Sequence, residues 1–171
     1  GSCLLATGAC SFTTSALAIG THSIGASYAG DGNRTGSVAA PVTQTIAKAT
    51  STTTLTAAPA SIASGQTVTL SVAVSSGDGT TPTGSIALSD GSVAIGSCTL
   101  TAGACTFTTT GLAIGTHALT ARWEGDALRN GSTSSTATVV VGKALTTTTL
   151  TATPNPSDRK STRLNSSHIT I

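Results

Sequence analysis

The sequence lacks most of the side chains that carry charge or form stacking surfaces. Charged residues make up 8% of its 171 residues and aromatic residues 2%, and methionine is absent. Carbohydrate-binding surfaces usually expose several aromatic rings, and two Phe, one Tyr and one Trp leave few rings beyond the needs of a core. Long apolar runs are also missing, since the longest strongly apolar piece is the three valines at 139–141, far short of a membrane span.

An excess of charge of one sign is missing as well. Up to residue 157 the chain carries five basic and five acidic side chains, at Arg34, Lys48, Arg122, Arg129, Lys143 and at Asp31, Asp78, Asp90, Glu124, Asp126. The formal net charge of +2 therefore comes from residues 158–171, where Arg159, Lys160 and Arg163 outnumber Asp158. Because no basic patch remains, neither nucleic acid nor an anionic membrane is expected as a partner.

What the chain does contain is an internal repeat with a constant offset of 95 residues. Gly1-Ser2-Cys3 recurs as Gly96-Ser97-Cys98, and 32 of the first 59 positions are identical to their counterparts without a gap. A fixed period indicates tandem copies of one folding unit. At this length the unit is a whole small domain, which can bury a core of its own.

The phase of the repeat divides the chain into four predicted parts. Residues 1–47 are expected to be the C-terminal half of a truncated unit, residues 48–142 one complete unit, and residues 143–157 the first strand of a third. Residues 158–171 match nothing in the repeat; they resemble the translation of a sequencing adapter, and we interpret them as an artefact tail. The truncated unit is expected to expose sheet edges and to be less stable than the complete one.

The complete unit is predicted to be β-structure throughout. Short segments rich in Thr and Val are separated by turns of Gly, Asp and Pro, and no apolar stripe with helical spacing occurs. Seven strands are predicted, at residues 50–57, 66–74, 83–89, 96–100, 104–109, 116–123 and 134–141. Seven strands in about 95 residues are typical of an immunoglobulin-like β-sandwich, so the predicted fold is all-β with tandem Ig-like domains.

Three segments of the complete unit carry a family resemblance. In order they are TPTGSIALSDG, GSCTLTAGACTFTTTGLAIGTHALTARWEGD and STSSTATVVV. Their order and spacing resemble the bacterial Ig-like domain repeat family, in which Leu88 would usually be aromatic and Trp123 a Tyr. The resemblance implies a secreted or cell-surface protein whose domains form stalks, adhesin shafts or spacers. The partners it implies are neighbouring Ig-like domains of the same chain, with a cell-surface glycan or protein as a further partner.

The four cysteines occupy two positions of the repeat, as Cys3 with Cys10 and Cys98 with Cys105. Each pair flanks a short turn, so an antiparallel hairpin would place the two thiols on facing strands. We therefore predict one disulfide within each hairpin, which implies oxidising, extracellular surroundings. A metal or redox site is the alternative, but six residues separate the cysteines of a pair and each unit offers a single His as a further ligand.

The other chemically suggestive residues have structural interpretations. His22 and His117 begin a predicted strand and are expected to bond locally, because no carboxylate or nucleophile marks a general base beside them. Asp31 and Asp126 follow Gly in a turn, where Asp caps backbone amides, and the carboxylates are too scattered for calcium. The aromatic residues are expected to anchor the core between the sheets: Phe12, Tyr28, Phe107 and Trp123.

These observations predict a non-enzymatic extracellular stalk or adhesion-associated spacer, without a cofactor or metal. The joints at residues 47–49 and 142–144 are short, which indicates a semi-rigid rod. The alternative function is an accessory carbohydrate-binding module of a secreted enzyme, in which Trp123 would be the exposed ring that contacts the sugar. An enzyme is not expected, because the repeat shows no nucleophile–base pair, paired carboxylates or metal-ligand cluster.

Overall fold

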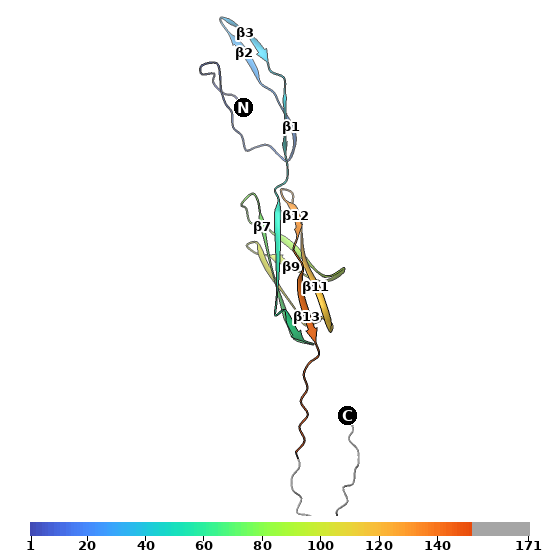
Figure 1. The fold of residues 1–171 in the computed structure, drawn as a ribbon. Helices are drawn as coiled ribbons and strands as arrows, with labels where there is room; N and C mark the ends of the chain where they lie inside the picture. The colour runs from blue at the N-terminus through green and yellow to red at the C-terminus, as the bar shows by residue number, and fades with distance from the viewer. Residues whose placement is uncertain (152–171) are drawn as a thin grey trace, which may run out of the picture.

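The computed structural model describes residues 1–151, which form strands and no helix (Figure 1). The strands are β1 (Gly20–Ile24), β2 (Ser27–Asp31), β3 (Arg34–Val38), β4 (Val42–Ile46), β5 (Ser51–Ala58), β6 (Ser61–Ala63), β7 (Val68–Ser76), β8 (Gly84–Asp90), β9 (Val93–Leu100), β10 (Ala104–Thr109), β11 (Gly115–Gly125), β12 (Asn130–Thr133) and β13 (Ala137–Gly142). This part of the chain therefore contains no helix that is long and apolar enough to cross a membrane. The predicted artefact tail and the end of the predicted third unit lie outside the described residues.

Strands β5 to β13 build a two-layer sandwich. One layer is a three-stranded sheet in the order β10-β7-β5, and the other has the order β6-β13-β11-β8-β9, with β12 paired along β11. The paired strands are antiparallel, apart from β6 and β13, which run parallel. The predicted all-β fold class is confirmed.

Alternation along β7 shows why the two layers pack together. Its apolar side chains occupy every second position and share one face, since successive side chains of a strand point to opposite faces. They join the apolar side chains of the facing sheet in one core: Val68, Leu70, Val72 and Val74 with Ile86, Leu88, Leu119, Trp123 and Val139, each at most 5% exposed. Burial of one such aliphatic side chain stabilises the fold by about 1.5–3 kcal/mol.

All seven strands predicted for residues 48–142 are present, with their ends moved by a few residues. The prediction missed β6 and β12, which are three and four residues long. β12 has the sequence Asn-Gly-Ser-Thr, which is typical of a turn, and it becomes a strand because β11 runs on beside it as far as Gly125. The last strand begins at Ala137 rather than 134, because Ser134 is occupied in hydrogen bonds to the backbone of Ala121.

Residues 1–47 form smaller sheets. β1 pairs with β4 and β2 with β3, each as a two-stranded sheet, and residues 1–19 contribute an isolated bridge between Ala6 and Ala9. Every residue from 1 to 50 is exposed or half-buried. The repeated sequence is thus present in two copies, whereas a tandem array of complete sandwiches stays a prediction.

Candidate functional site at the joint

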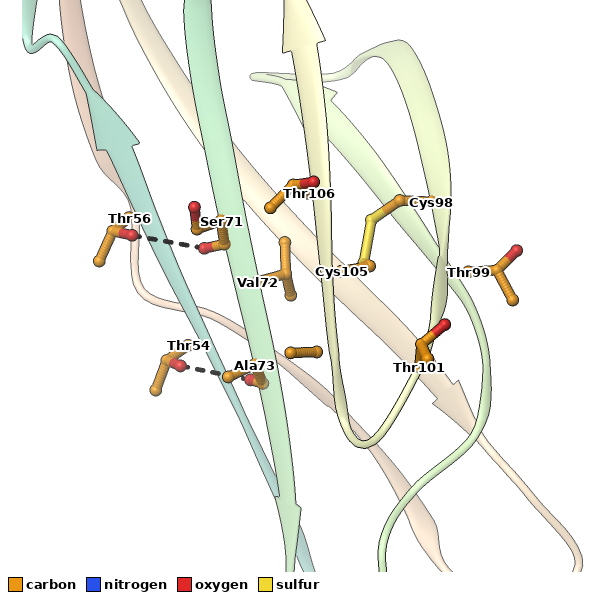
Figure 2. Close-up of a pocket in the computed structure, with 11 residues that line it drawn as sticks. Thr54, Thr56, Ser71, Val72, Ala73, Cys98, Thr99, Thr101, Cys105 and Thr106 are labelled. Atoms are coloured by element: carbon orange, nitrogen blue, oxygen red, sulfur yellow. Dashed lines mark hydrogen bonds between the residues drawn. A yellow bond between two sulfur atoms is a disulfide. The ribbon is translucent and has the colours of Figure 1, made fainter.

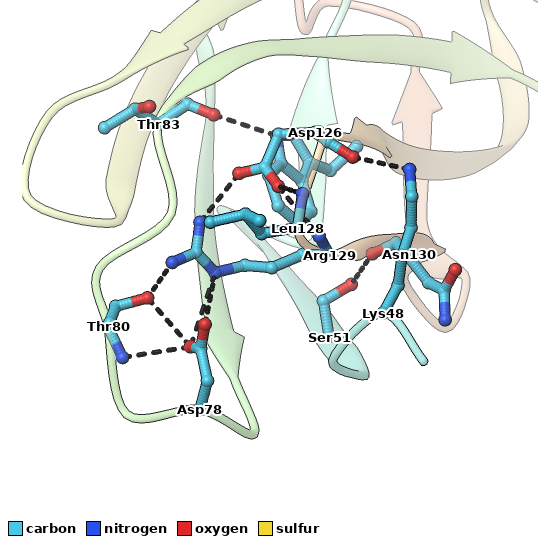
Figure 3. A network of polar contacts seen from close by, with 10 residues as sticks. Lys48, Ser51, Asp78, Thr80, Thr83, Asp126, Leu128, Arg129 and Asn130 are labelled. Atoms are coloured by element: carbon cyan, nitrogen blue, oxygen red, sulfur yellow. Dashed lines mark hydrogen bonds and ion pairs between the residues drawn. The ribbon is translucent and has the colours of Figure 1, made fainter. Parts of the chain in front are cut away.

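The chain enters the sandwich through a joint that is fastened to a neighbouring turn. Ala49 N donates to Leu128 O at 3.0 Å and Asn130 N donates to Ala49 O at 2.9 Å, so the segment before β5 pairs with the turn between β11 and β12. Lys48 Nζ adds a hydrogen bond of 2.7 Å to Asp126 O. We name this end of the sandwich, formed by residues 48–53, 76–83 and 125–132, the joint end (Figure 3).

Arg129 ties two loops together at the joint end. Its Nε donates to Asp78 Oδ2 at 3.0 Å, its Nη1 donates to Asp126 Oδ2 at 2.7 Å, and its Nη2 contacts the hydroxyl of Thr80. The side chain of Arg129 is only 11% exposed, so its two ion pairs are largely shielded from water. The hydroxyls of Ser76 and Thr80 hold the pKa of Asp78 well below its usual range, so this partner stays ionised.

Asp126 shapes the turn that carries Arg129. Its Oδ1 accepts hydrogen bonds from the backbone amides of Leu128 and Arg129, both at 2.8 Å, and the bond from Leu128 is the main reason that the pKa of Asp126 is lowered. Gly125, just before it, has a φ of 85°, and a Cβ there would lie 2.6 Å from Arg129 O. Glycine is therefore required at this position. The predicted amide-capping role of Asp126 is confirmed.

The same turn occurs one repeat earlier, in a more exposed setting. Asp31 Oδ1 accepts from Asn33 N at 2.8 Å, and Arg34 Nη1 lies 3.1 Å from Asp31 Oδ2. The side chain of Arg34 is 73% exposed, because no loop corresponding to residues 77–83 covers it. The local sequence therefore determines the geometry of the turn, whereas the complete sandwich shields the ion pair from water.

Three hydroxyl groups fasten β5 to β12 beneath the joint. Ser51 Oγ donates to Asn130 O at 2.7 Å, and Thr53 Oγ1 lies 2.7 Å from Ser132 Oγ. Thr53 is 4% exposed, and the contact with Ser132 satisfies the hydrogen-bonding need of its buried hydroxyl. β5 and β12 belong to different sheets, and these hydroxyls therefore connect the two layers at the joint end.

Each cysteine pair forms a disulfide. The Cα atoms of Cys3 and Cys10 are 5.8 Å apart, and those of Cys98 and Cys105 are 5.9 Å apart. Cys98 lies on β9 and Cys105 on β10, so the second disulfide connects the two sheets (Figure 2).

An open groove of about 720 Å³ lies beside this disulfide, on the outer side of β5, β7 and β10. Its lining includes Thr54, Thr56 and Thr106, and none of the lining side chains is charged. The hydroxyls of Thr54 and Thr56 donate to carbonyl groups of β7, so they are already used within the sheet. The groove offers small, neutral groups and no acid or base for catalysis.

Trp123 is a core residue and not an exposed ring. It is 1% exposed, and its Nε1 donates to Thr83 O at 3.0 Å. The prediction that Trp123 could contact a sugar is therefore wrong, because its indole ring is enclosed between the sheets. The predicted core position is confirmed for Trp123 and Phe107. It is wrong for Phe12, which is 58% exposed because the two small sheets of residues 1–47 do not enclose it, and Tyr28 is only half-buried.

His117 has a partner that the sequence analysis missed. Its Nδ1 lies 2.6 Å from Asp90 Oδ2, and its Nε2 lies 2.7 Å from Ala113 O. The expectation of a local bond is confirmed, whereas the expectation that no carboxylate lies nearby is wrong. Asp90 ends β8, and the antiparallel pairing of β8 with β11 brings it to His117 across 27 positions of sequence. Nothing in the spacing of the two residues indicates this contact.

The described residues contain no group of three or more His, Cys, Asp or Glu side chains that could hold a metal ion. Comparison with known families gives one match: the model of the bacterial Ig-like domain, group 3, matches residues 55–142, from within β5 to the end of β13. Neither a curated protein nor a solved structure matches the chain. The matched range includes Cys98, Cys105, Trp123 and Arg129, and it leaves residues 1–54 outside.

Proposed function

The chain belongs to the bacterial Ig-like domain family, group 3, and we propose that it acts as a non-enzymatic spacer, in a stalk or adhesion-associated role, of an extracellular or cell-surface protein. Domains of this family are typical of surface proteins and are usually not catalytic. The disulfide between β9 and β10 supports an oxidising location outside the cytoplasm.

The observation that carries the proposal is the path of the chain through the sandwich. The chain enters beside the C-terminal end of β11, where Ala49 pairs with Arg129. It leaves beside the N-terminal end of the same strand, where Val141 pairs with Gly115 (Figure 1). β11 has 11 residues, and at about 3.3 Å per residue the two ends are about 33 Å apart. A unit that the chain crosses from end to end adds its whole length to a rod.

The joint end supports a rod of limited flexibility. Between β4 and β5 only residues 47–50 are free of strand, and Lys48 and Ala49 within them are bonded to the turn at 126–128. A short, bonded connection leaves few rotatable bonds between a unit and the one before it. We therefore expect consecutive units to keep a preferred direction instead of turning freely, as a spacer requires.

Residual dipolar couplings of the whole chain test this proposal. If the joint is semi-rigid, couplings from β1 to β4 and from β5 to β13 fit one alignment tensor. A variant with eight Gly and Ser residues inserted after Ala47 is the matched control, and there the two sets require separate tensors. The spacer proposal fails if the unmodified chain already behaves like the insertion variant, because a freely turning joint cannot hold a distance.

A further inference from the structure

His117 stands between two hydrogen-bond acceptors. On one side of the ring is the carboxylate of Asp90, 2.6 Å from Nδ1, and on the other is the carbonyl oxygen of Ala113, 2.7 Å from Nε2. The side chain of His117 is 11% exposed, so water has little access to replace either contact. A carboxylate oxygen and a carbonyl oxygen both accept hydrogen bonds.

The protonation state of the ring follows from these partners. A neutral imidazole carries one N–H and can donate to one acceptor only, which leaves its second nitrogen lone pair facing an oxygen. The imidazolium form carries two N–H groups and satisfies both contacts at once. The geometry around His117 thus fits the charged form and is unfavourable for the neutral one.

We propose that protonated His117 is a pH-dependent clamp that holds together the end of the sandwich opposite the joint and loosens it as the pH rises. The clamp connects three segments: the end of β8 through Asp90, the loop at 110–114 through Ala113, and the start of β11. Asp90 strengthens the connection, because its Oδ1 accepts from Ala118 N at 3.1 Å. The chain leaves the sandwich at this end, next to Gly115.

The loop at 110–114 is the part that the clamp controls. Leu112 is 8% exposed and inserts into the core, whereas Ile114 is 57% exposed at the surface. The carbonyl between them, that of Ala113, is held by His117. Loss of this bond frees the loop around Leu112 and changes the surface that Ile114 offers to whatever follows the domain.

The charges near His117 all favour protonation. Asp90, at the end of β8, is the one charged group on the elements beside the ring, since the loop at 110–114 and β13, which pairs with β11 at His117, carry none among the described residues. The hydrogen bond that His117 donates to Asp90 is the main cause that raises the pKa of His117, and the bond to the carbonyl of Ala113 adds to it. Because the pKa of His117 is raised in the folded state, the clamp stabilises the fold fully at pH values below the pKa of His117 in the unfolded chain. This stabilisation is lost as the pH rises through the pKa of His117 in the folded chain. The clamp is a property of a single sandwich and does not depend on the spacer role.

Nuclear magnetic resonance of the full chain tests the clamp directly. Long-range proton–nitrogen spectra should show both nitrogens of His117 protonated at pH 6.5, the ordinary pKa of histidine, with a titration midpoint above that value. In Asp90→Asn, which keeps an oxygen for the Ala118 amide, the midpoint should fall by about one pH unit or more. Asp78→Asn, at the joint end, is the control and should leave the midpoint of His117 unchanged.

Hydrogen-exchange protection factors of residues 111–115 provide the second readout. They should decrease as the pH rises through the midpoint of His117, and in Asp90→Asn the decrease should occur at lower pH. The proposal is overturned if His117 titrates at or below 6.5, if Asp90→Asn leaves its midpoint in place, or if protection of the loop is the same with His117 charged and neutral.

Discussion

Residues 1–47 and residues 96–142 are two copies of one sequence segment, yet only the second copy is packed. Leu119 is fully buried and its counterpart Ile24 is 46% exposed, while Leu100 is 5% exposed and its counterpart Leu5 is 53% exposed. The strands differ as well, since the 11 residues of β11 correspond to β1 and β2, two strands of five residues each. Two related sequences, identical at 6 of 12 positions between residues 20–31 and 115–126, thus give a core strand in one place and two surface strands in the other.

The partner strands explain the difference. At Thr120 and Ala121, β11 continues because it pairs with β8 on one side. The counterparts of these two residues, Gly25 and Ala26, have no such neighbour, and there β1 ends before β2 begins. Within this chain the first copy has no counterparts of β5, β7 and β8. Burial in this chain therefore depends on pairing across the unit, and at the break itself the first copy also has Gly25 where the second has Thr120, a residue that favours strands.

The largest expected difference between the copies concerns one aromatic position. Trp123→Ala removes a fully buried side chain from the core and should lower the free energy of unfolding by about 3–5 kcal/mol. Tyr28→Ala, at the same position of the first copy, removes a half-buried ring and should cost less than about 1 kcal/mol. Urea denaturation of the whole chain, followed by circular dichroism, compares the two variants. Equal losses would mean that the first copy has a core of its own.

The disulfides give the second difference. Replacement of Cys98 and Cys105 by Ser together should lower the free energy of unfolding by about 2.5 kcal/mol, because the unfolded chain regains the freedom of the closed loop. The same replacement of Cys3 and Cys10 should leave the unfolding of residues 51–142 unchanged, since that pair lies among exposed residues. Denaturation without a reducing agent compares the two double variants. Free thiols found by mass spectrometry in the unreduced chain would contradict the premise of both.

Much of the fold could be predicted from the sequence, because its signals are local. The alternation in β7, the turn at Asp126 and the hairpin between β9 and β10 each depend on residues close together in sequence. β12 was missed because its Asn-Gly-Ser-Thr sequence is that of a turn, and only a long neighbouring strand makes it pair. Phe12 was misplaced because the two-stranded sheets of the first copy do not cover it, and that copy has no counterparts of β5, β7 and β8 to complete a sandwich.

The candidate site was harder to predict, because its contacts are long-range. Arg129 meets Asp78 across 51 positions, and His117 meets Asp90 across 27. The sequence identified Asp126 as a turn cap from the preceding Gly, but it contained no signal that Arg129 would be shielded between two carboxylates. Such contacts follow from strand register, which the pattern of apolar residues does not specify for the loops.

The turns at Asp31 and Asp126 should respond to acid in the same way in both copies. The pKa of Asp31 and that of Asp126 both lie below the ordinary 3.8, chiefly through the bond from the amide two residues later. A depressed pKa stabilises the turn above the unfolded value, and this contribution is lost as the pH falls through the folded value. Hydrogen exchange of the backbone amides of Asn33 and Leu128, followed during acid titration, should therefore stay slow at pH 3.8. It should become faster only below that pH. If Leu128 alone stays protected, the sandwich and not the local turn sets the acid resistance.

The smallest expected effect lies in the hairpin turns, which both copies share. Ala102 and Gly103, with φ of 52° and 78°, form the two-residue turn inside the bridge between Thr101 and Ala104. Thr7 and Gly8, with φ of 54° and 82°, form the matching turn inside the bridge between Ala6 and Ala9. A residue with a Cβ is strained at positive φ, so Ala102→Gly should raise the free energy of unfolding by about 0.5–1 kcal/mol after the entropy of the new glycine is counted. Thr7→Gly relieves the same local strain, but it should not change the unfolding of residues 51–142, since strain affects cooperative unfolding only where the hairpin is part of the packed unit. A measurable gain from Thr7→Gly in that transition would show that the two copies unfold together.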